Sequence, residues 1–229
     1  MSQELFDEAA NYEEMLNRGL RLSGEDKTFF MEGRLECLRS VLPAGYSPAE
    51  VLDFGCGTGE TSKRLLERFE GAHVVGVDVS AGALEHARQH HGSEDISFFD
   101  VDSFEAPATF DLCYSNGAFH HIEPAQRLRV LRRLHELLRP GGLLAVFDNN
   151  PWNPGTRLVM RRIPFDRGAQ TIDAMRMRRL VTAAGFELAG PSRHIFIFPA
   201  PLKALRRLEP HLQRFPLGAQ YLVLARRPV

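Results

Sequence analysis

The stretch Val51-Leu-Asp-Phe-Gly-Cys-Gly-Thr-Gly-Glu60 joins an apolar strand to a helix through three glycines at alternate positions. Glycine is used where backbone turns tightly or lies against a ligand with no Cβ in the way. Gly55, Gly57 and Gly59 stand at the carboxyl end of the predicted strand, which is where ligands bind in open α/β sheets. The pattern predicts a loop that binds a nucleoside cofactor.

A second predicted strand, His73-Val-Val-Gly-Val-Asp-Val-Ser80, follows about one helix later and ends in Asp78. An acid there can accept hydrogen bonds from both hydroxyls of a ribose. The loop lacks the third glycine of a G-x-G-x-x-G dinucleotide site, and no Lys follows the glycines as in a phosphate-binding P-loop. Asp53 beside the loop would repel phosphate but suits the ammonium of an amino acid. We therefore expect a ligand other than a phosphate.

This arrangement resembles the first motif of the class I S-adenosylmethionine-dependent methyltransferases, and the resemblance covers roughly residue 50 to the end of the chain. Three further segments follow in the family's order: Ile96-Ser-Phe-Phe-Asp-Val-Asp102, Phe110-Asp-Leu-Cys-Tyr-Ser-Asn-Gly-Ala-Phe-His-His-Ile122 and Leu137-Leu-Arg-Pro-Gly-Gly-Leu-Leu-Ala-Val-Phe147. The resemblance implies a Rossmann-like sheet of seven strands with an antiparallel last strand. It also implies methyltransferase activity, with S-adenosylmethionine as cofactor.

The alternation of helix and strand patterns independently predicts an α/β fold with a mainly parallel, doubly wound sheet and helices on both faces. Helical spacing is expected over residues 4–20, 26–42, 58–69, 80–90, 128–138, 172–184 and 201–213, and strands over 50–54, 143–147, 193–198 and 219–226. We interpret residues 1–229 as a single methyltransferase domain, divided into an N-terminal helical cap (1–45), a cofactor-binding core (46–148), a substrate lid insertion (149–171) and a C-terminal part of the sheet (172–229).

Several residues outside the glycine loop are assigned to the cofactor through the resemblance. The family places an acid near the adenine amino group, and Asp100 is the first choice with Asp102 as the alternative. Tyr12 and Arg34 could close over the cofactor and pair with its carboxylate, or could be an ordinary core Tyr and surface Arg. The complete predicted cofactor-binding set is Asp53, Gly55, Cys56, Gly57, Thr58, Gly59, Asp78, Val79, Asp100, Val101, Ser115, Asn116, Tyr12 and Arg34.

Two adjacent histidines are the candidate bases. Methyl transfer from a sulfonium is an in-line displacement that needs alignment and exclusion of water more than strong polar catalysts. A hydroxyl acceptor must also lose its proton, and His accepts protons near neutral pH. His121 is favoured as that base and His120 comes next, while Asp148 could orient the imidazole or bind substrate. The pair could instead pack or cap the following helix.

The segment 149–171 is rich in Pro, Asn, Gly and Arg and is predicted to be weakly ordered and to cover the substrate. Trp152 is a candidate pocket residue. Arg side chains bind carboxylate or phosphate bidentately, so an anionic acceptor such as a sugar nucleotide or acidic metabolite is one hypothesis, and solvated helix charge is the alternative. The sequence of the segment 149–171 also resembles a subgroup of bacterial methyltransferases associated with glycan and other secondary pathways. The arginines concerned are Arg157, Arg161, Arg162 and Arg167.

Composition sets the remaining limits. The chain has 229 residues, 44% of them hydrophobic, and a net charge of −1, which gives no reason to expect nucleic acid as partner. No long apolar run or secretory leader is present, and the three cysteines have neither paired nor metal-binding spacing; we therefore expect no membrane span, no metal site and a cytoplasmic location. A small-molecule methyltransferase is the favoured function. A nucleic-acid or protein methyltransferase and a non-catalytic cofactor-binding protein are the alternatives.

Overall fold

The computed structural model describes residues 24–166 and 168–229. The predicted helix over 4–20, Tyr12 and Arg167 lie outside the described residues. Within the part of the chain that the structure describes, none of the helices combines the length and the apolar character needed to cross a bilayer.

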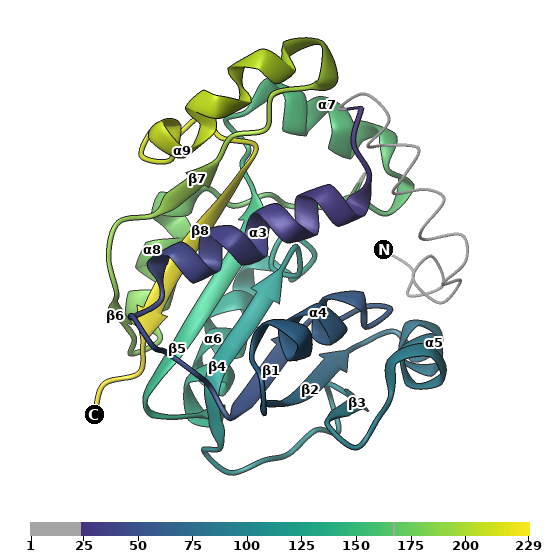
Figure 1. Ribbon diagram of the computed structural model, residues 1–229. Coiled ribbons are helices and arrows are strands. Elements are labelled where there is room, and N and C mark those ends of the chain that lie inside the picture. The colour runs from purple at the N-terminus through teal and green to yellow at the C-terminus, as the bar shows by residue number, and fades with distance from the viewer. Residues whose placement is uncertain (1–23, 167) are drawn as a thin grey trace.

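One mixed sheet forms the centre of the protein (Figure 1). Its parallel strands are β1 (Glu50–Phe54), β2 (His73–Asp78), β3 (Ile96–Asp100), β4 (Phe110–Asn116) and β5 (Leu138–Asn149). Three more strands complete it: β6 (Glu187–Leu188), β7 (Arg193–Ile195) and β8 (Gln220–Arg226). The order is β3-β2-β1-β4-β5-β8-β6, and β8 runs antiparallel to β5. The predicted mainly parallel sheet with an antiparallel last strand is therefore confirmed.

Helices cover both faces of this sheet, as the alternation of elements predicts (Figure 1). One core contains side chains of α3 (Lys27–Val41), α4 (Glu60–Arg68) and α5 (Ala81–His91), and the other contains side chains of α6 (Pro124–Leu137) and α8 (Ala174–Ala183). Strand β5 shows the two-residue period of a strand that is buried on both sides. Ala145 and Phe147 belong to the first core, whereas Leu144 and Val146 belong to the second.

Among the described residues the sheet has eight strands rather than the predicted seven, because β6 pairs with β8 ahead of the predicted sixth strand over 193–198, which corresponds to β7. Both β6 and β7 pair with β8, and the four residues 189–192 between them face only the two residues of β8 between Leu222 and Ala225. Gly190 has a φ of 146°, and Pro191 has no N–H to donate to a ladder. The predicted strand over 193–198 also stops at Ile195, ahead of Pro199.

Two segments are more structured, or differently structured, than predicted. Residues 149–171, expected to be weakly ordered, contain α7 (Pro154–Arg162) and the 3₁₀ helix η1 (Pro164–Asp166). Asn153 caps α7, because its side-chain oxygen accepts a hydrogen bond from the Thr156 amide at 2.9 Å. The predicted α-helix over 201–213 is instead a 3₁₀ helix, η2 (Ala200–Leu208), followed by the short α9 (Glu209–Leu212).

Candidate active site

The glycine loop between β1 and α4 has the left-handed backbone for which glycine is suited. Gly55, Gly57 and Gly59 have φ values of 78°, 52° and 82°, a region that costs other residues energy. A Cβ on Gly59 would also lie 2.7 Å from the Phe98 ring. These conformations explain why α4 begins at Glu60 and not at the predicted Thr58.

Asp78 at the end of β2 holds the loop in place. Its Oδ2 accepts a hydrogen bond from the Gly57 amide at 2.8 Å, and its Oδ1 accepts one from the Ser80 amide at 3.0 Å. A carboxylate offers about four acceptor positions, so these contacts leave capacity for ribose hydroxyls. The next residue, Val79, is 48% exposed and presents an apolar surface beside that carboxylate.

Asp100 lies opposite Asp78 on the neighbouring strand β3. Its Oδ1 accepts hydrogen bonds from the amides of Asp102 and Ser103 at 2.9 and 3.2 Å. Asp100 therefore organises the turn after β3, while the alternative, Asp102, is exposed. Val101 lies between Asp100 and Asp102 in sequence, and its amide donates to the Asp78 carbonyl at 3.0 Å. The structure thus brings the predicted acids of β2 and β3 to one edge of the sheet.

Asp53 is buried beneath the loop. Its Oδ2 accepts a hydrogen bond from the Ser62 hydroxyl of α4 at 2.7 Å. Burial raises the pKa of Asp53 to about 7, and the nearby Asp78 charge adds to that rise, although the Ser62 hydrogen bond and Arg34 oppose it. A carboxyl of this kind gains from a cationic ligand placed beside it.

Several buried polar atoms around the carboxyl end of β4 have no hydrogen-bond partner among the described residues. They include Ser115 Oγ and Asn116 Oδ1 on β4, and Arg34 Nε on α3. Arg34 is anchored through its Nη1, which donates to Gln220 Oε1 at 3.1 Å. Because buried polar groups are normally satisfied, these atoms fit a polar ligand in contact with β4. Arg34, Ser115 and Asn116 are all among the predicted cofactor contacts.

The two histidines that follow β4 meet two buried carboxylates. His120 Nδ1 lies 2.5 Å from Asp148 Oδ1 at the end of β5. His120 Nε2 lies 3.4 Å from Asp166 Oδ1, and His121 Nε2 lies 3.3 Å from the same oxygen. His120 and Asp166 are buried, whereas the His121 side chain is 20% exposed. We call these four residues the His–Asp cluster.

The charges of the His–Asp cluster favour a protonated His120. Burial alone would lower the pKa of His120, but the Asp148 and Asp166 carboxylates outweigh it and raise the pKa to about 10. Burial likewise favours a neutral Asp166, yet hydrogen bonds and charge from the two imidazoles hold its pKa below the ordinary value. At neutral pH His120 is thus an imidazolium between two carboxylates, which makes it a poor proton acceptor.

This geometry corrects one predicted relation and adds one residue. Asp148 was predicted either to orient the imidazole of His121, the favoured base, or to bind substrate; it contacts His120, and Asp166 contacts His121. Asp166 is a site residue that was not predicted from the sequence; it ends the 3₁₀ helix η1 and is buried. Ligand atoms of His120, His121 and Asp166 lie within 4.8 Å of one another, a spacing that could hold a metal ion. No metal site was predicted from the sequence.

Hydrogen bonds hold the segment 168–170 against the His–Asp cluster. The Gln170 amide donates to the His120 carbonyl at 2.8 Å. Buried Arg127 of α6 donates through Nε to the Ile122 carbonyl at 2.9 Å and through Nη2 to the Gln170 carbonyl. Arg127 is therefore a positioning residue that fixes the loop carrying both histidines.

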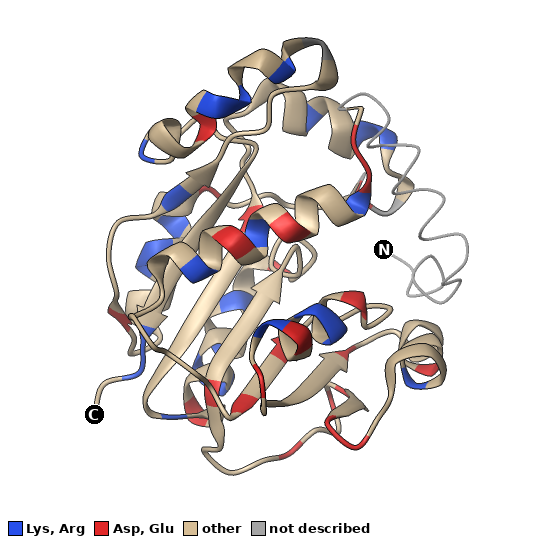
Figure 2. Cartoon of the chain, viewed as in Figure 1, with Lys and Arg blue, Asp and Glu red and all other residues tan. Residues whose placement is uncertain are grey.

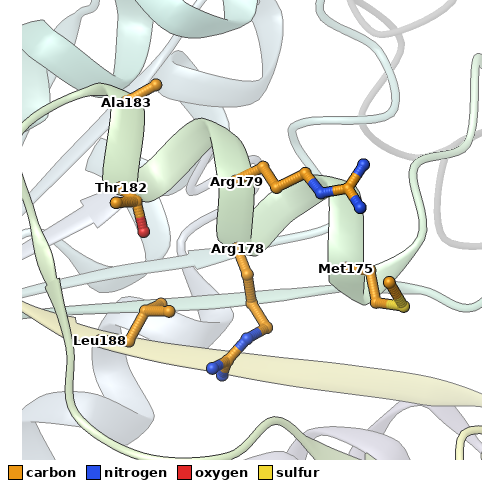
Figure 3. A pocket seen from close by; sticks show the side chains of 6 residues that line it. All are labelled: Met175, Arg178, Arg179, Thr182, Ala183 and Leu188. Atoms are coloured by element: carbon orange, nitrogen blue, oxygen red, sulfur yellow. The ribbon is translucent and has the colours of Figure 1, made fainter.

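The predicted substrate residues that the structure describes lie at the surface of the 149–171 segment. Trp152 is 49% exposed, and Arg157, Arg161 and Arg162 are exposed on α7. None of the three arginines forms an ion pair with another described residue. A separate groove of about 500 Å³ runs along α8, lined by Met175, Arg178, Arg179, Thr182, Ala183 and Leu188 (Figure 3). It shares no residue with the His–Asp cluster or the glycine loop.

Comparison with known proteins agrees with this arrangement. Residues 51–142 match the family model described as a methyltransferase domain. A trans-aconitate 2-methyltransferase of Deinococcus radiodurans is 45% identical over 98 residues, which cover 43% of this chain and 37% of that protein. A malonyl-[acyl-carrier protein] O-methyltransferase of Pectobacterium atrosepticum is 36% identical over 111 residues, which cover 48% and 42%. The chain spans less than half the length of these two relatives.

Solved structures share the fold. An S-adenosylmethionine-dependent methyltransferase from Mesorhizobium loti has a TM-score of 0.64 at 22% identity and covers 85% of this chain and 98% of its own. A geranyl diphosphate C-methyltransferase from Streptomyces coelicolor has a TM-score of 0.63 at 16% identity, with 86% and 79% covered. These likenesses show that the chain has the Rossmann-like fold of the two solved structures. Residues 51–142 thus match a methyltransferase-domain family, and the curated relatives that align with part of this chain are methyltransferases.

Proposed function

We propose that this chain transfers the methyl group of S-adenosylmethionine to a small-molecule acceptor, with His121 as the base. The proposal is carried by the juxtaposition of the glycine loop and the histidine segment. A Cβ on Gly55 of the glycine loop would lie 2.7 Å from the Cβ of Ala118, which is two residues before His120. The reactive methyl of a cofactor held by the loop would therefore face the His–Asp cluster.

The three parts of the cofactor can be assigned to described residues in one orientation, with the adenine toward β3 and the methionine moiety toward β4. We assign the ribose to Asp78, the adenine to the surface of Val79 and Val101 with Asp100 at its rim, and the methionine moiety to Asp53 and the β4 end. Arg34 supplies a cation within reach of that end of the sheet, as the predicted pairing with the cofactor carboxylate requires. Thr58 contributes a backbone amide, whereas the Cys56 amide donates to the Val77 carbonyl at 3.1 Å and so holds the loop against β2.

The His–Asp cluster provides the acid–base chemistry. Once His121 donates its Nε2–H to Asp166, its Nδ1 is the ring nitrogen that takes the acceptor's proton, and Asp148 and the His120 imidazolium are positioning residues. A bond forms between the acceptor oxygen or nitrogen and the methyl carbon, the carbon–sulfur bond breaks, and S-adenosylhomocysteine leaves. Helices α7 and η1 form the lid that carries Asp166 to the site and excludes water.

The acceptor is a metabolite that carries a hydroxyl or amine, and we propose Trp152, Arg157, Arg161 and Arg167 as contacts for its distal, anionic or glycan-like part. The net charge of −1 speaks against a nucleic-acid substrate. Calorimetric titration tests the cofactor class, with S-adenosylmethionine expected to bind and NAD expected to give no heat. Transfer of labelled methyl to a panel of hydroxylated, aminated and acidic metabolites then tests catalysis. Cofactor binding without transfer to any acceptor class would favour a non-catalytic protein.

Cofactor affinity is expected to rise with pH and to level off above about 7. The raised pKa of Asp53, about 7, means that the unliganded protein holds this carboxyl protonated at lower pH. The ammonium and sulfonium of the cofactor favour the ionised form, so binding below pH 7 must release a proton, and the dissociation constant should fall up to about tenfold per pH unit. Calorimetry in buffers of different ionisation enthalpy measures both the dissociation constant and the number of protons released. Asp53→Asn should abolish the slope, and a slope that persists in that variant would contradict the assignment to Asp53.

A further inference from the structure

The 3₁₀ helix η2 is attached to the rest of the protein through polar contacts. Arg206 pairs with Glu25 at 2.7 Å, donates through Nε to the Phe198 carbonyl at 3.0 Å, and lies over the Phe29 ring. Glu209, just after η2, accepts a hydrogen bond from the Phe198 amide at 2.7 Å. Arg206 and Glu209 thus point toward the rest of the protein, whereas polar side chains of a surface helix usually face solvent.

Leucines of η2 consequently face solvent. Leu205 and Leu208 are three residues apart and so share one face of the 3₁₀ helix, while Leu202 lies at a kink of η2 with φ −108° and ψ 19°. Leu202, Leu205 and Leu208 are 46%, 38% and 44% exposed. Phe215 and Leu217 follow at 59% and 55%. We call these five residues the apolar row. Single exposed apolar residues are ordinary, but five of them within the segment 202–217 concentrate apolar surface in one part of the chain.

The apolar row is flanked by positive charge. Lys203, Arg207 and Arg214 are exposed and form no ion pair with another described residue. The arginines of α7 lie close by, because Asn153 at the start of that helix donates to the Leu217 carbonyl at 2.7 Å. Figure 2 shows this concentration of basic residues over η2 and α7 at the top of the molecule. The local excess of cations contrasts with the net charge of −1 for the whole chain.

We propose that the apolar row and its basic flank form a docking surface for an anionic lipid bilayer. Apolar side chains inserted at the headgroup level, surrounded by Lys and Arg, are the combination that binds proteins to the interface of anionic membranes without spanning them. Charge complementarity selects this occupant, since an uncharged partner would gain nothing from the cations beside the leucines. The docked face also carries the lid segment α7, so the acceptor side of the site would open toward the membrane surface.

Flotation with extruded vesicles tests the proposal on the full chain. With vesicles of phosphatidylcholine and phosphatidylglycerol at about 0.1 M salt, we expect binding roughly ten- to a hundredfold stronger than with phosphatidylcholine alone, because each Lys or Arg near the surface adds attraction. About 0.5 M salt should remove most of the difference. The double variant Leu205→Asp, Leu208→Asp should lose at least about tenfold in vesicle binding, and Arg207→Glu with Arg214→Glu should lose the preference for anionic lipid.

Matched variants on other surfaces provide the controls. Met175→Asp changes an exposed apolar residue of the α8 groove, and Arg132→Glu changes an exposed arginine of α6; both should bind vesicles like the unaltered protein. Cofactor titration of every variant shows whether the fold and the cofactor site persist. The result of the vesicle-binding test is therefore independent of whether the proposed methyl transfer is correct. Equal binding to neutral and anionic vesicles, no binding, a leucine-dependent dimer in sedimentation, or stronger competition by nucleic acid than by anionic lipid would each overturn the proposal.

Discussion

Replacing His121 by alanine is expected to lower methyl-transfer turnover by about 10²- to 10⁴-fold, the range typical of a lost general base. His121 is the more exposed of the two histidines, and Asp166, 3.3 Å from its Nε2, fixes the ring so that the other nitrogen can take a proton. The cofactor dissociation constant should change by less than about twofold, because the glycine loop and Asp78 are untouched. Steady-state kinetics and calorimetry on the same preparation measure the two effects.

A matched control is His90→Ala, which removes an exposed imidazole of α5 far from the cluster and should leave turnover unchanged. Asp166→Asn should reduce turnover less than His121→Ala, since an amide still holds the ring by a hydrogen bond but loses the charge. Unchanged turnover in His121→Ala would overturn the base assignment. Such a result would favour an acceptor that is already ionised, such as a carboxylate, which attacks without a base.

Local pattern was enough to predict the central sheet and its layers. The strands around Leu52, Val75 and Val146 are short segments rich in Val, Leu and Phe, bounded by glycines or acids. Their local pattern agrees with their burial in the sheet, so it was enough to predict them. The broken edge strand was less accessible to prediction, because β6 and β7 are defined by pairing with β8 at the end of the chain. Pairing with β8 is a contact between segments distant in sequence, which local pattern does not predict. Gly190-Pro191 indicates locally only that a strand is interrupted there.

The cofactor loop could be placed from spacing alone, but the His–Asp cluster could not. Glycines at alternate positions predict a left-handed backbone conformation locally. Which of His120 and His121 contacts Asp148, in contrast, depends on which ring faces the end of β5. That orientation follows from the turn after β4, where the His121 amide bonds to the Ala118 carbonyl at 3.0 Å. Asp166 reaches the histidines across 45 residues of sequence through the folding of α7 and η1, which composition had indicated to be weakly ordered.

The second large effect is expected at Asp78. Asp78→Ala should weaken S-adenosylmethionine binding by roughly 10²- to 10⁴-fold, because hydrogen bonds to a charged acceptor contribute about 1.5 to 3 kcal/mol each and two ribose hydroxyls are assigned to this carboxylate. Asp95→Ala, which removes an exposed acid just before β3, serves as the control and should bind normally. Calorimetry measures the affinities, and circular dichroism verifies that the sheet is retained.

Asp78 also holds the Gly57 amide, so weaker binding alone could reflect a loosened loop instead of lost ribose contacts. A cofactor analogue that lacks one ribose hydroxyl separates the two causes, since the pair of changes forms a double-mutant cycle. The unaltered protein should bind the deoxy analogue more weakly than the cofactor, and Asp78→Ala should bind both equally, because the partner of the missing hydroxyl is gone. If the variant still discriminated between them as strongly as the unaltered protein, the ribose would lie elsewhere and Asp78 would serve only to shape the loop.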